Sequence, residues 1–334
     1  MSTTPEFHSR FNIVNHTVPA STPRFVLSCN IYKRISTSLK DKSNNSSTPP
    51  IIFTHANGFH KEIWEPVISR LSSRWSAGDM YAFDCRNQGD SAVLNKDVIE
   101  DTFDWYSYAA DILKVVDTYN LKNAIGVGHS YGASAFILAE AMRPGTFSTI
   151  VAIDPTMFPK AIYTNGTLDN HPMAQGTLRR RDTWNDREDA RASLLRKRFF
   201  KAWHPEAFEL YLKYGMLDVV NKDGTTGITL KCPKFQEAIT FAAVGGGVND
   251  AYERLNELDI PVHIIAGADS DINVPELVEM KVNQCKYGSV DFIEDTGHLV
   301  CLEKPEETAN KISAFLDQFW DSRGDEQERP KARL

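Results

Sequence analysis

The feature that most limits the possible folds is a short turn, Gly128-His-Ser-Tyr-Gly132, placed between a strand and a helix. The apolar run 124–127 before it predicts a buried strand, and the run 131–142 after it predicts a helix. The turn matches the pattern G-x-S-x-G, whose glycines permit a strained bend that leaves the serine oxygen accessible. Ser130 is therefore a candidate nucleophile, at a helix N-terminus that favours developing negative charge.

Strands and helices alternate along most of the chain. Short apolar runs predict strands at residues 51–54, 80–83, 124–127, 149–153, 262–265 and 290–293. Amphipathic or apolar patterns predict helices at residues 62–71, 105–119, 131–142, 275–285 and 305–320. Residues 11–33 are expected to form two antiparallel strands that lead into this series. Because such alternation builds a mostly parallel sheet with helices on both faces, the predicted fold class is α/β.

One long segment, residues 156–258, interrupts the alternation. It has no convincing strand, and it is helix-rich, aromatic and basic. An insertion of this length after the sixth strand is expected to form a helical cap above the site. The expected organisation is a core of residues 1–155 and 259–320, the cap 156–258 and a flexible tail 321–334.

A serine hydroxyl is a weak nucleophile and needs a base beside it. His298 follows the last predicted strand in the sequence Glu-Asp-Thr-Gly-His, and Gly297 permits a tight turn there. In sheet proteins with a G-x-S-x-G turn, the triad residues follow one another along the chain in the order Ser, acid, His. His298 fits the last place in this order. His298 is therefore the candidate base for Ser130.

Three aspartates compete for the acid that orients His298. Asp154 ends the strand after the nucleophile helix, whereas Asp269 and Asp271 follow the next strand. The usual pattern after that strand is Gly-x-x-Asp, but its acidic slot holds Ser270 here. Asp154 is therefore favoured, with Asp271 as the rival and Asp269 third. The acid would fix the tautomer of the imidazole and stabilise its protonated form.

Acyl chemistry needs two backbone N–H groups aimed at the developing oxyanion. One is expected from Tyr131, directly after the candidate nucleophile, and the other from Asn57 in the loop after the strand 51–54. His55 in the same loop is expected to hold the loop in place. A further turn, 84–91, matches D-x-R-x-x-G-x-S, and its Arg86 and Asp90 are expected to pair with each other.

Composition and charge narrow the functional classes. The formal net charge of -7 argues against a nucleic-acid partner. The five cysteines lack CxxC spacing, which indicates free thiols in a reducing compartment. There is no P-loop, GxGxxG or HExxH motif, so neither a cofactor nor a metal is expected. No apolar run is long enough for a signal peptide or a membrane span.

The end of the sequence has the form of a targeting signal. Ala332, Arg333 and Leu334 match the small-basic-Leu pattern of a peroxisomal tripeptide and follow a polar, charged stretch. The pattern predicts recognition by the peroxisomal import receptor and a peroxisomal location.

With these residues in view, the chain resembles the α/β-hydrolase superfamily along nearly all its length. More narrowly, it is similar to a fungal group of peroxisomal lipases, the mycophenolic-acid acyl-CoA hydrolase and hydrolases of AK-type toxin pathways. The likeness lies in the loop HANGFHKEIWEPV at 55–67, the turn GHSYGA at 128–133 and the terminal ARL. This group places its acid after the sixth strand, which implies Asp154, and Asp269 and Asp271 are a departure from its pattern.

The resemblance implies a serine hydrolase of acyl esters or acyl-CoA thioesters in peroxisomal lipid or secondary-metabolite (toxin) biosynthesis. Basic residues of the cap would then meet CoA phosphates, namely Arg179, Arg180, Arg181, Arg196 and Arg198. A solvated basic helix face explains the same charges without a ligand. Two other functions stay open: acyl transfer or lyase chemistry with water excluded, and a non-catalytic small-molecule receptor.

Overall fold

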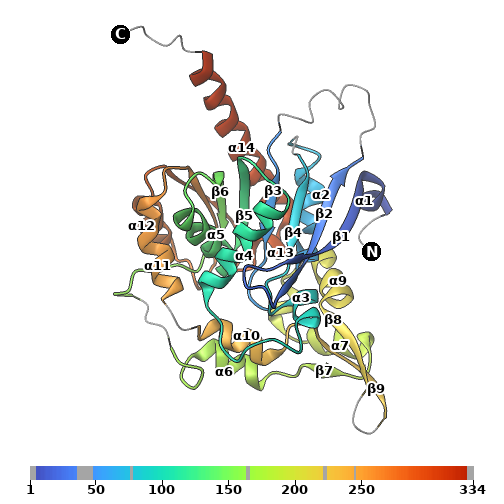
Figure 1. The fold of residues 1–334 in the computed structure, drawn as a ribbon. Coiled ribbons are helices and arrows are strands. Elements are labelled where there is room, and N and C mark those ends of the chain that lie inside the picture. The colour runs from blue at the N-terminus through green and yellow to red at the C-terminus, as the bar shows by residue number, and fades with distance from the viewer. Residues whose placement is uncertain are drawn as a thin grey trace.

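The central element is an eight-stranded sheet (Figure 1). The computed structural model describes residues 5–35, 48–75, 78–162, 166–220, 224–243 and 246–328. The strands run in the order β1-β2-β4-β3-β5-β6-β10-β11. Their bounds are β1 Phe11–Pro19, β2 Val26–Arg34, β3 Ile51–Thr54, β4 Met80–Phe83, β5 Ala124–His129, β6 Phe147–Ile153, β10 Val262–Gly267 and β11 Gly288–Ile293. Only the β1–β2 and β2–β4 pairings are antiparallel, which confirms the predicted mostly parallel sheet.

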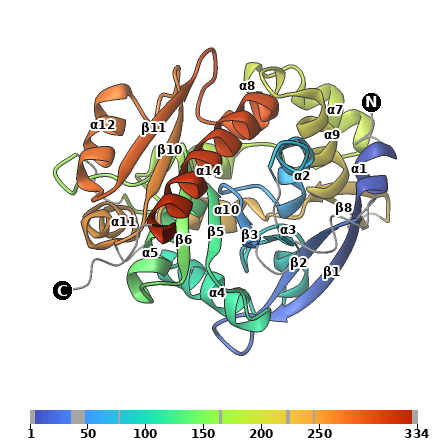
Figure 2. The ribbon, with the colours of Figure 1, turned by 90° about the horizontal axis from the view of Figure 1, so that it is seen from above.

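Helices cover both faces of this sheet (Figure 2). One face carries α4 Trp105–Thr118, α5 Tyr131–Met142 and α12 Pro275–Gln284, and the other carries α2 Glu65–Leu71 and α14 Pro305–Glu328. The shorter helices are α1 Pro5–Arg10, the 3₁₀ turn η2 Lys61–Trp64, α3 Gly89–Leu94 and α13 Val300–Glu303.

Neighbouring residues of each central strand enter opposite cores. In β6, Ile150 and Ala152 pack with the α4–α5 side, while Val151 and Ile153 pack with the α2–α14 side. Side chains alternate between faces with a period of two, so a strand buried on both faces has to be apolar throughout. This explains why the sequence shows these strands as continuous apolar runs.

The segment 156–258 forms most of a cap at one end of the sheet (Figure 1). Its helices are α6 Pro172–Arg179, α7 Arg187–Leu194, α8 Arg198–Lys201, α9 Pro205–Tyr214, α10 Lys234–Phe241, α11 Gly247–Glu253 and the 3₁₀ turn η3 Arg254–Glu257. The last two pack against α5 of the core, so the chain rejoins the core before residue 258.

The expectation that this segment has no strand is wrong. A three-stranded antiparallel sheet lies in it, in the order β7 Thr183–Trp184, β9 Thr226–Leu230, β8 Met216–Val220. The strands are short and the signal before β9, Lys222-Asp-Gly224, is a turn sequence that points to a hairpin. Helix α14 also continues to Glu328, beyond its predicted end at residue 320. Ala332, Arg333 and Leu334 lie outside the described residues.

Candidate active site

The turn between β5 and α5 holds Ser130 in a strained conformation. Its φ is 57° and its ψ is −125°, which a residue with a side chain rarely adopts. A Cβ on Gly128 would lie 2.6 Å from the Cα of Ala133, and one on Gly132 would lie 2.6 Å from the carbonyl oxygen of His55. Both glycines are therefore required by close backbone approach, and this is the physical reason for the G-x-S-x-G pattern.

Three side chains far apart in the sequence form one hydrogen-bonded chain at this turn. His298 Nε2 lies 3.0 Å from Ser130 Oγ, and His298 Nδ1 lies 2.7 Å from Asp154 Oδ1. We refer to Ser130, His298 and Asp154 as the triad. Asp269 and Asp271 are exposed instead, and no hydrogen bond links either side chain to His298 within the described part of the chain.

Asp154 is fully buried, and donors from several directions surround its carboxylate. Gly267 N–H donates to Oδ2 at 3.0 Å, while Ser270 Oγ at 2.9 Å and Asn273 Nδ2 at 2.6 Å donate to Oδ1. Burial on its own would raise the pKa of Asp154, but the hydrogen bonds from His298, Asn273 and Gly267 lower it below its usual value. The carboxylate is therefore held ionised beside the imidazole.

Ser270 explains why the acid is not found at its usual position. It stands in the slot where a Gly-x-x-Asp pattern would carry the acid, and there its hydroxyl donates to Asp154. Its oxygen in turn accepts the backbone N–H groups of Ile272 and Asn273 at 3.3 and 3.1 Å. Because that oxygen already accepts twice, its proton is directed to Asp154.

A residue that the sequence analysis missed contacts the candidate nucleophile. Thr156 Oγ1 lies 3.4 Å from Ser130 Oγ, and Ser134 Oγ donates to the Thr156 carbonyl at 2.9 Å. Thr156 comes two residues after Asp154, so the end of β6 supplies both the acid and a hydroxyl beside the serine. Its position directly after a strand that ends in an aspartate was the one available signal.

The loop after β3 packs directly on the serine turn. Thr54 Oγ1 donates to the Gly132 carbonyl at 3.0 Å. The Asn57 side chain is turned toward α10, because its Nδ2 donates to the Glu237 carbonyl at 2.9 Å and its Oδ1 accepts from Gln88 at 2.6 Å. Within the described residues, no protein acceptor takes the backbone N–H of Asn57 or of Tyr131. The oxyanion role expected of these two N–H groups stays a prediction.

His55 holds this loop, as the sequence analysis expects. Its Nδ1–H donates to the Ala56 carbonyl at 2.8 Å, and its Nε2 accepts the Cys85 N–H at 3.1 Å. Burial lowers the pKa of His55 to about 3, so the ring is neutral at physiological pH. The side chain is therefore fully used in structural contacts.

The expected pair of Arg86 with Asp90 is wrong. Arg86 donates to both carboxylate oxygens of Asp111 on α4, at 2.7 and 2.8 Å. Asp90 faces the other way and pairs with Lys61 at 2.6 Å and with Lys231. The two residues stand four positions apart in the turn, and their side chains contact different neighbours.

The cap arginines differ in how far they are already paired. Arg180 makes a two-pronged ion pair with the buried Glu237, and Arg181 pairs with Asp189 at 2.6 Å. Arg179 donates to a neighbouring glutamine at 3.2 Å. Arg196 and Arg198 are exposed at the start of α8. Among the described residues, these five arginines share no common ion-pair partner.

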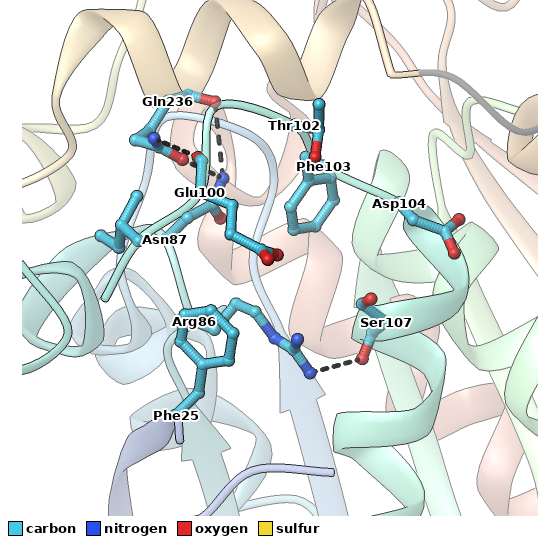
Figure 3. A pocket seen from close by; sticks show the side chains of 10 residues that line it. Phe25, Arg86, Asn87, Glu100, Thr102, Phe103, Asp104, Ser107 and Gln236 are labelled. Atoms are coloured by element: carbon cyan, nitrogen blue, oxygen red, sulfur yellow. Dashed lines mark hydrogen bonds between the residues drawn. The ribbon is translucent and has the colours of Figure 1, made fainter. Parts of the chain in front are cut away.

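A pocket at the seam between core and cap lies apart from the triad (Figure 3). Its wall includes Arg86, which donates to the Ser107 carbonyl at 3.4 Å, and Asn87, whose Nδ2 donates to Gln236 at 3.3 Å. The other lining residues are Phe25, Ile99, Glu100, Thr102, Phe103 and Asp104. None of the three triad residues lines this pocket.

The described residues contain no group of three or more His, Cys, Asp and Glu side chains arranged to hold a metal ion. None of the helices in this part of the chain combines the length and apolar character that crossing a membrane requires.

The sheet order and the strained serine turn are those of the α/β-hydrolase fold, and this defines the class of the protein. The alpha/beta hydrolase family matches residues 51–311, so the chain belongs to that family. The predicted fold class and superfamily are confirmed.

Relatives and solved structures agree with this assignment. The chain is 26% identical over 225 residues to the Abhydrolase domain-containing protein ACTT2-1 of Alternaria alternata, covering 58% of this chain and 83% of that protein. It is 24% identical over 234 residues to the Type I acyl-CoA thioesterase mpaH of Penicillium brevicompactum, covering 63% and 53%. The structure of the peroxisomal alpha-beta-hydrolase Lpx1 from Saccharomyces cerevisiae superposes with a TM-score of 0.77 at 20% identity, covering 94% of this chain and 90% of that one.

Proposed function

We propose that this chain is a serine hydrolase that cleaves acyl esters or acyl-CoA thioesters through an acyl-enzyme. The observation that carries the proposal is the hydrogen-bonded triad, in which Ser130 Oγ lies 3.0 Å from His298 Nε2 at the strained turn. A serine becomes nucleophilic when a base can take its proton, and the base works when a buried acid fixes its tautomer. Asp154 has the position and the ionised state for that role.

The reaction follows from this arrangement in two halves. Ser130 Oγ attacks the acyl carbonyl carbon and its proton passes to His298 Nε2, while the carbonyl π electrons move to the oxygen. The oxyanion accepts hydrogen bonds from the backbone N–H groups of Tyr131 and Asn57. Collapse breaks the bond to the alkoxide or thiolate, which takes the proton from His298. Water then repeats the sequence on the acyl-enzyme and releases the free acid.

Relatives and surface charge support a thioester as one substrate class. The Penicillium relative is named as an acyl-CoA thioesterase. Of the five cap arginines, Arg196 and Arg198 are exposed and Arg179 makes only a neutral hydrogen bond, so these three are the ones open to CoA phosphates. Arg180 and Arg181 are paired with carboxylates and would have to exchange them for a ligand.

A peroxisomal location is part of the proposal. The structural neighbour from Saccharomyces is named as a peroxisomal hydrolase. A fluorescent protein fused before the chain is expected to enter peroxisomes, and the same fusion without Ala332, Arg333 and Leu334 is expected to stay outside. Equal distribution of both fusions would contradict recognition by the import receptor.

Turnover tests the proposed chemistry. The measurement compares short- and long-chain acyl-CoA with p-nitrophenyl esters, for the natural chain and Ser130→Ala, by release of thiol or nitrophenol. Preferred thioester cleavage that depends on Ser130 would assign an acyl-CoA hydrolase, and cleavage of esters alone would assign an esterase or lipase. Activity that survives Ser130→Ala, or no activity on either class, would overturn the hydrolase proposal in favour of a transferase, lyase or receptor.

A further inference from the structure

Behind the acid of the triad lies a buried lysine that the proposed reaction does not use. Lys281 belongs to α12, and only 1% of it is exposed. Its Nζ donates to the Pro155 carbonyl at 3.2 Å and to Asn273 Oδ1, and it lies 4.5 Å from the centre of the Phe158 ring. Within the described residues it makes no direct ion pair with a carboxylate. Burying an ammonium group in this way is costly, so its position requires an explanation.

The lysine fixes which way the Asn273 amide points. An ammonium group can only donate, so the atom of Asn273 that faces Lys281 has to be the amide oxygen. The amide nitrogen then faces Asp154 and donates to Oδ1 at 2.6 Å. Reversing the amide would place its N–H groups against the ammonium and its oxygen against the carboxylate. Lys281 thereby secures one of the donors that keep Asp154 ionised.

Lys281 and Asp154 are also opposite charges in one buried region, separated by a single amide group. Burial lowers the pKa of Lys281 to about 7, and the negative charge of Asp154 opposes this fall. Lys281 Nζ also donates to the carbonyl of Pro155, the residue that directly follows Asp154 in the sequence. The lysine is therefore tied to the acid through both a side chain and the backbone.

We propose that Lys281 is a positioning residue that acts through Asn273 as the buried counter-charge of Asp154. The inference rests on the proposed function, because it concerns the acid of the same triad. It adds a second charge to the field in which His298 works. When His298 takes the serine proton, the attraction of Asp154 favours the resulting imidazolium and the charge of Lys281 opposes it.

The sign of the pH effect follows from the groups that face His298. Asp154 from the end of β6 and Glu303 from α13 are the acidic ones, and Glu303 also accepts the N–H of Gly297 at 3.1 Å. His129 from β5 donates to the His298 carbonyl at 2.9 Å, and burial lowers the pKa of His129 to about 3, so it is neutral. Lys281 adds a cation on the far side of Asp154, which it reaches through Asn273, and on the acid side of pH 7 it is charged.

Removing the lysine charge should therefore change how the reactivity of Ser130 depends on pH. The experiment measures the second-order rate of Ser130 labelling by a fluorophosphonate from pH 5 to 9, for the natural chain, Lys281→Met and Lys281→Gln. We expect the acid limb of both variants to move to higher pH by about one unit, so that labelling becomes up to about tenfold slower at the acid end of the range. Lys281→Gln keeps a donor for the carbonyl oxygens, so it tests the charge even where Lys281→Met is too unstable to prepare.

A matched control and a clear contrary result complete the test. Lys286→Met lies at the end of the same helix region, where Lys286 is exposed and pairs with exposed Asp259, and its labelling profile should not change. Folded Lys281 variants with the acid limb of the natural chain would overturn the inference and leave Lys281 a purely structural residue. No labelling of Ser130 in the natural chain would instead overturn the proposed function itself.

Discussion

Two lysines, Lys61 and Lys281, are both buried, and the structure surrounds them differently. Lys61 Nζ lies 2.8 Å from Glu62, 3.1 Å from Asp84 and 2.6 Å from Asp90. Burial would lower its pKa, but these three carboxylates outweigh burial and raise the pKa above its usual value. For Lys281 burial prevails and lowers the pKa to about 7, because its contacts are two carbonyl oxygens and a ring.

The difference separates a structural charge from an adjustable one. Lys61 stays charged at every physiological pH and holds the Asp84 turn against the loop after β3, where its own N–H also donates to Asp84 at 2.7 Å. Lys281 stands behind the acid, and its burial brings its pKa close to neutrality. Direct ion pairing therefore surrounds the lysine that holds the Asp84 turn, and pairing through an amide links the other lysine to the acid of the proposed triad.

The largest expected effect tests whether Asp154 is the acid that acts with His298. Asp154→Asn should lower kcat about 10⁴-fold, because an amide cannot fix the same His298 tautomer or stabilise its charged form. Ester or thioester turnover measures the effect. Asp269→Asn and Asp271→Asn are the matched controls, since both side chains are exposed, and each should keep nearly full activity. A loss at Asp271 instead of Asp154 would return the acid to the rival position.

The second effect tests whether Lys61 stabilises the fold through its three carboxylate partners. Lys61→Met leaves three carboxylates without their buried cation, and we expect it to lower the free energy of unfolding by about 3–5 kcal/mol. Urea denaturation measures this change, with exposed Lys286→Met expected to be close to neutral. A loss below 1 kcal/mol would show that the three carboxylates do not depend on Lys61.

A smaller effect concerns Glu65, which lies near Lys61 and Glu62. Burial, aided by the charge of Glu62, raises the pKa of Glu65 to about 8. The folded protein thus keeps a proton that the unfolded chain gives up near pH 4.5, so this group's contribution to stability is complete below pH 4.5 and is lost as the pH rises through 8.

Glu65→Gln should remove that pH dependence. We expect the variant to be more stable than the natural chain by about 1–3 kcal/mol at pH 9, and nearly equal to it at pH 5. Denaturation curves at the two pH values provide the measurement. The same difference at both pH values would mean that Glu65 does not bind a proton in the folded state.

The smallest effect concerns Thr156, whose hydroxyl lies 3.4 Å from Ser130 Oγ. Thr156→Val keeps the shape and removes the hydrogen bond, so kcat should fall about three- to tenfold. Thr156→Ser restores the hydroxyl and should recover most of the activity in the same turnover assay. Equal activity of all three forms would leave Ser130 positioned by His298 alone.

The parts of the site that the sequence predicts are those carried by local patterns. The local backbone requires the glycines around Ser130 and the turn before His298. The motif and its place in the strand order are therefore enough to predict these two residues. The sequence favours Asp154 because Ser270 stands in the alternative slot, and the resemblance to the fungal hydrolases implies the same residue. The strands of the core were equally readable, because burial on both faces makes each one a continuous apolar run.

No local sequence pattern predicts the residues that support the triad, because each of them contacts residues far away in the sequence. Asn273 and Lys281 contact the acid from 119 and 126 residues away, counting the lysine contact to Pro155. Within α12 the lysine looks like any surface cation of an amphipathic helix. The partners of Arg86 and Asp90 were missed for the same reason, and the cap hairpin was missed because its strands are short.

Ser130 carries the acyl group in the proposed reaction, and mass spectrometry of the protein can detect this adduct directly. The protein is mixed with a slowly hydrolysed p-nitrophenyl ester, quenched in acid at early times and digested to locate the adduct. We expect one added acyl group on the peptide that contains Ser130, absent from Ser130→Ala and formed far more slowly in Asp154→Asn. Turnover without any adduct, or an adduct that persists in Ser130→Ala, would contradict it.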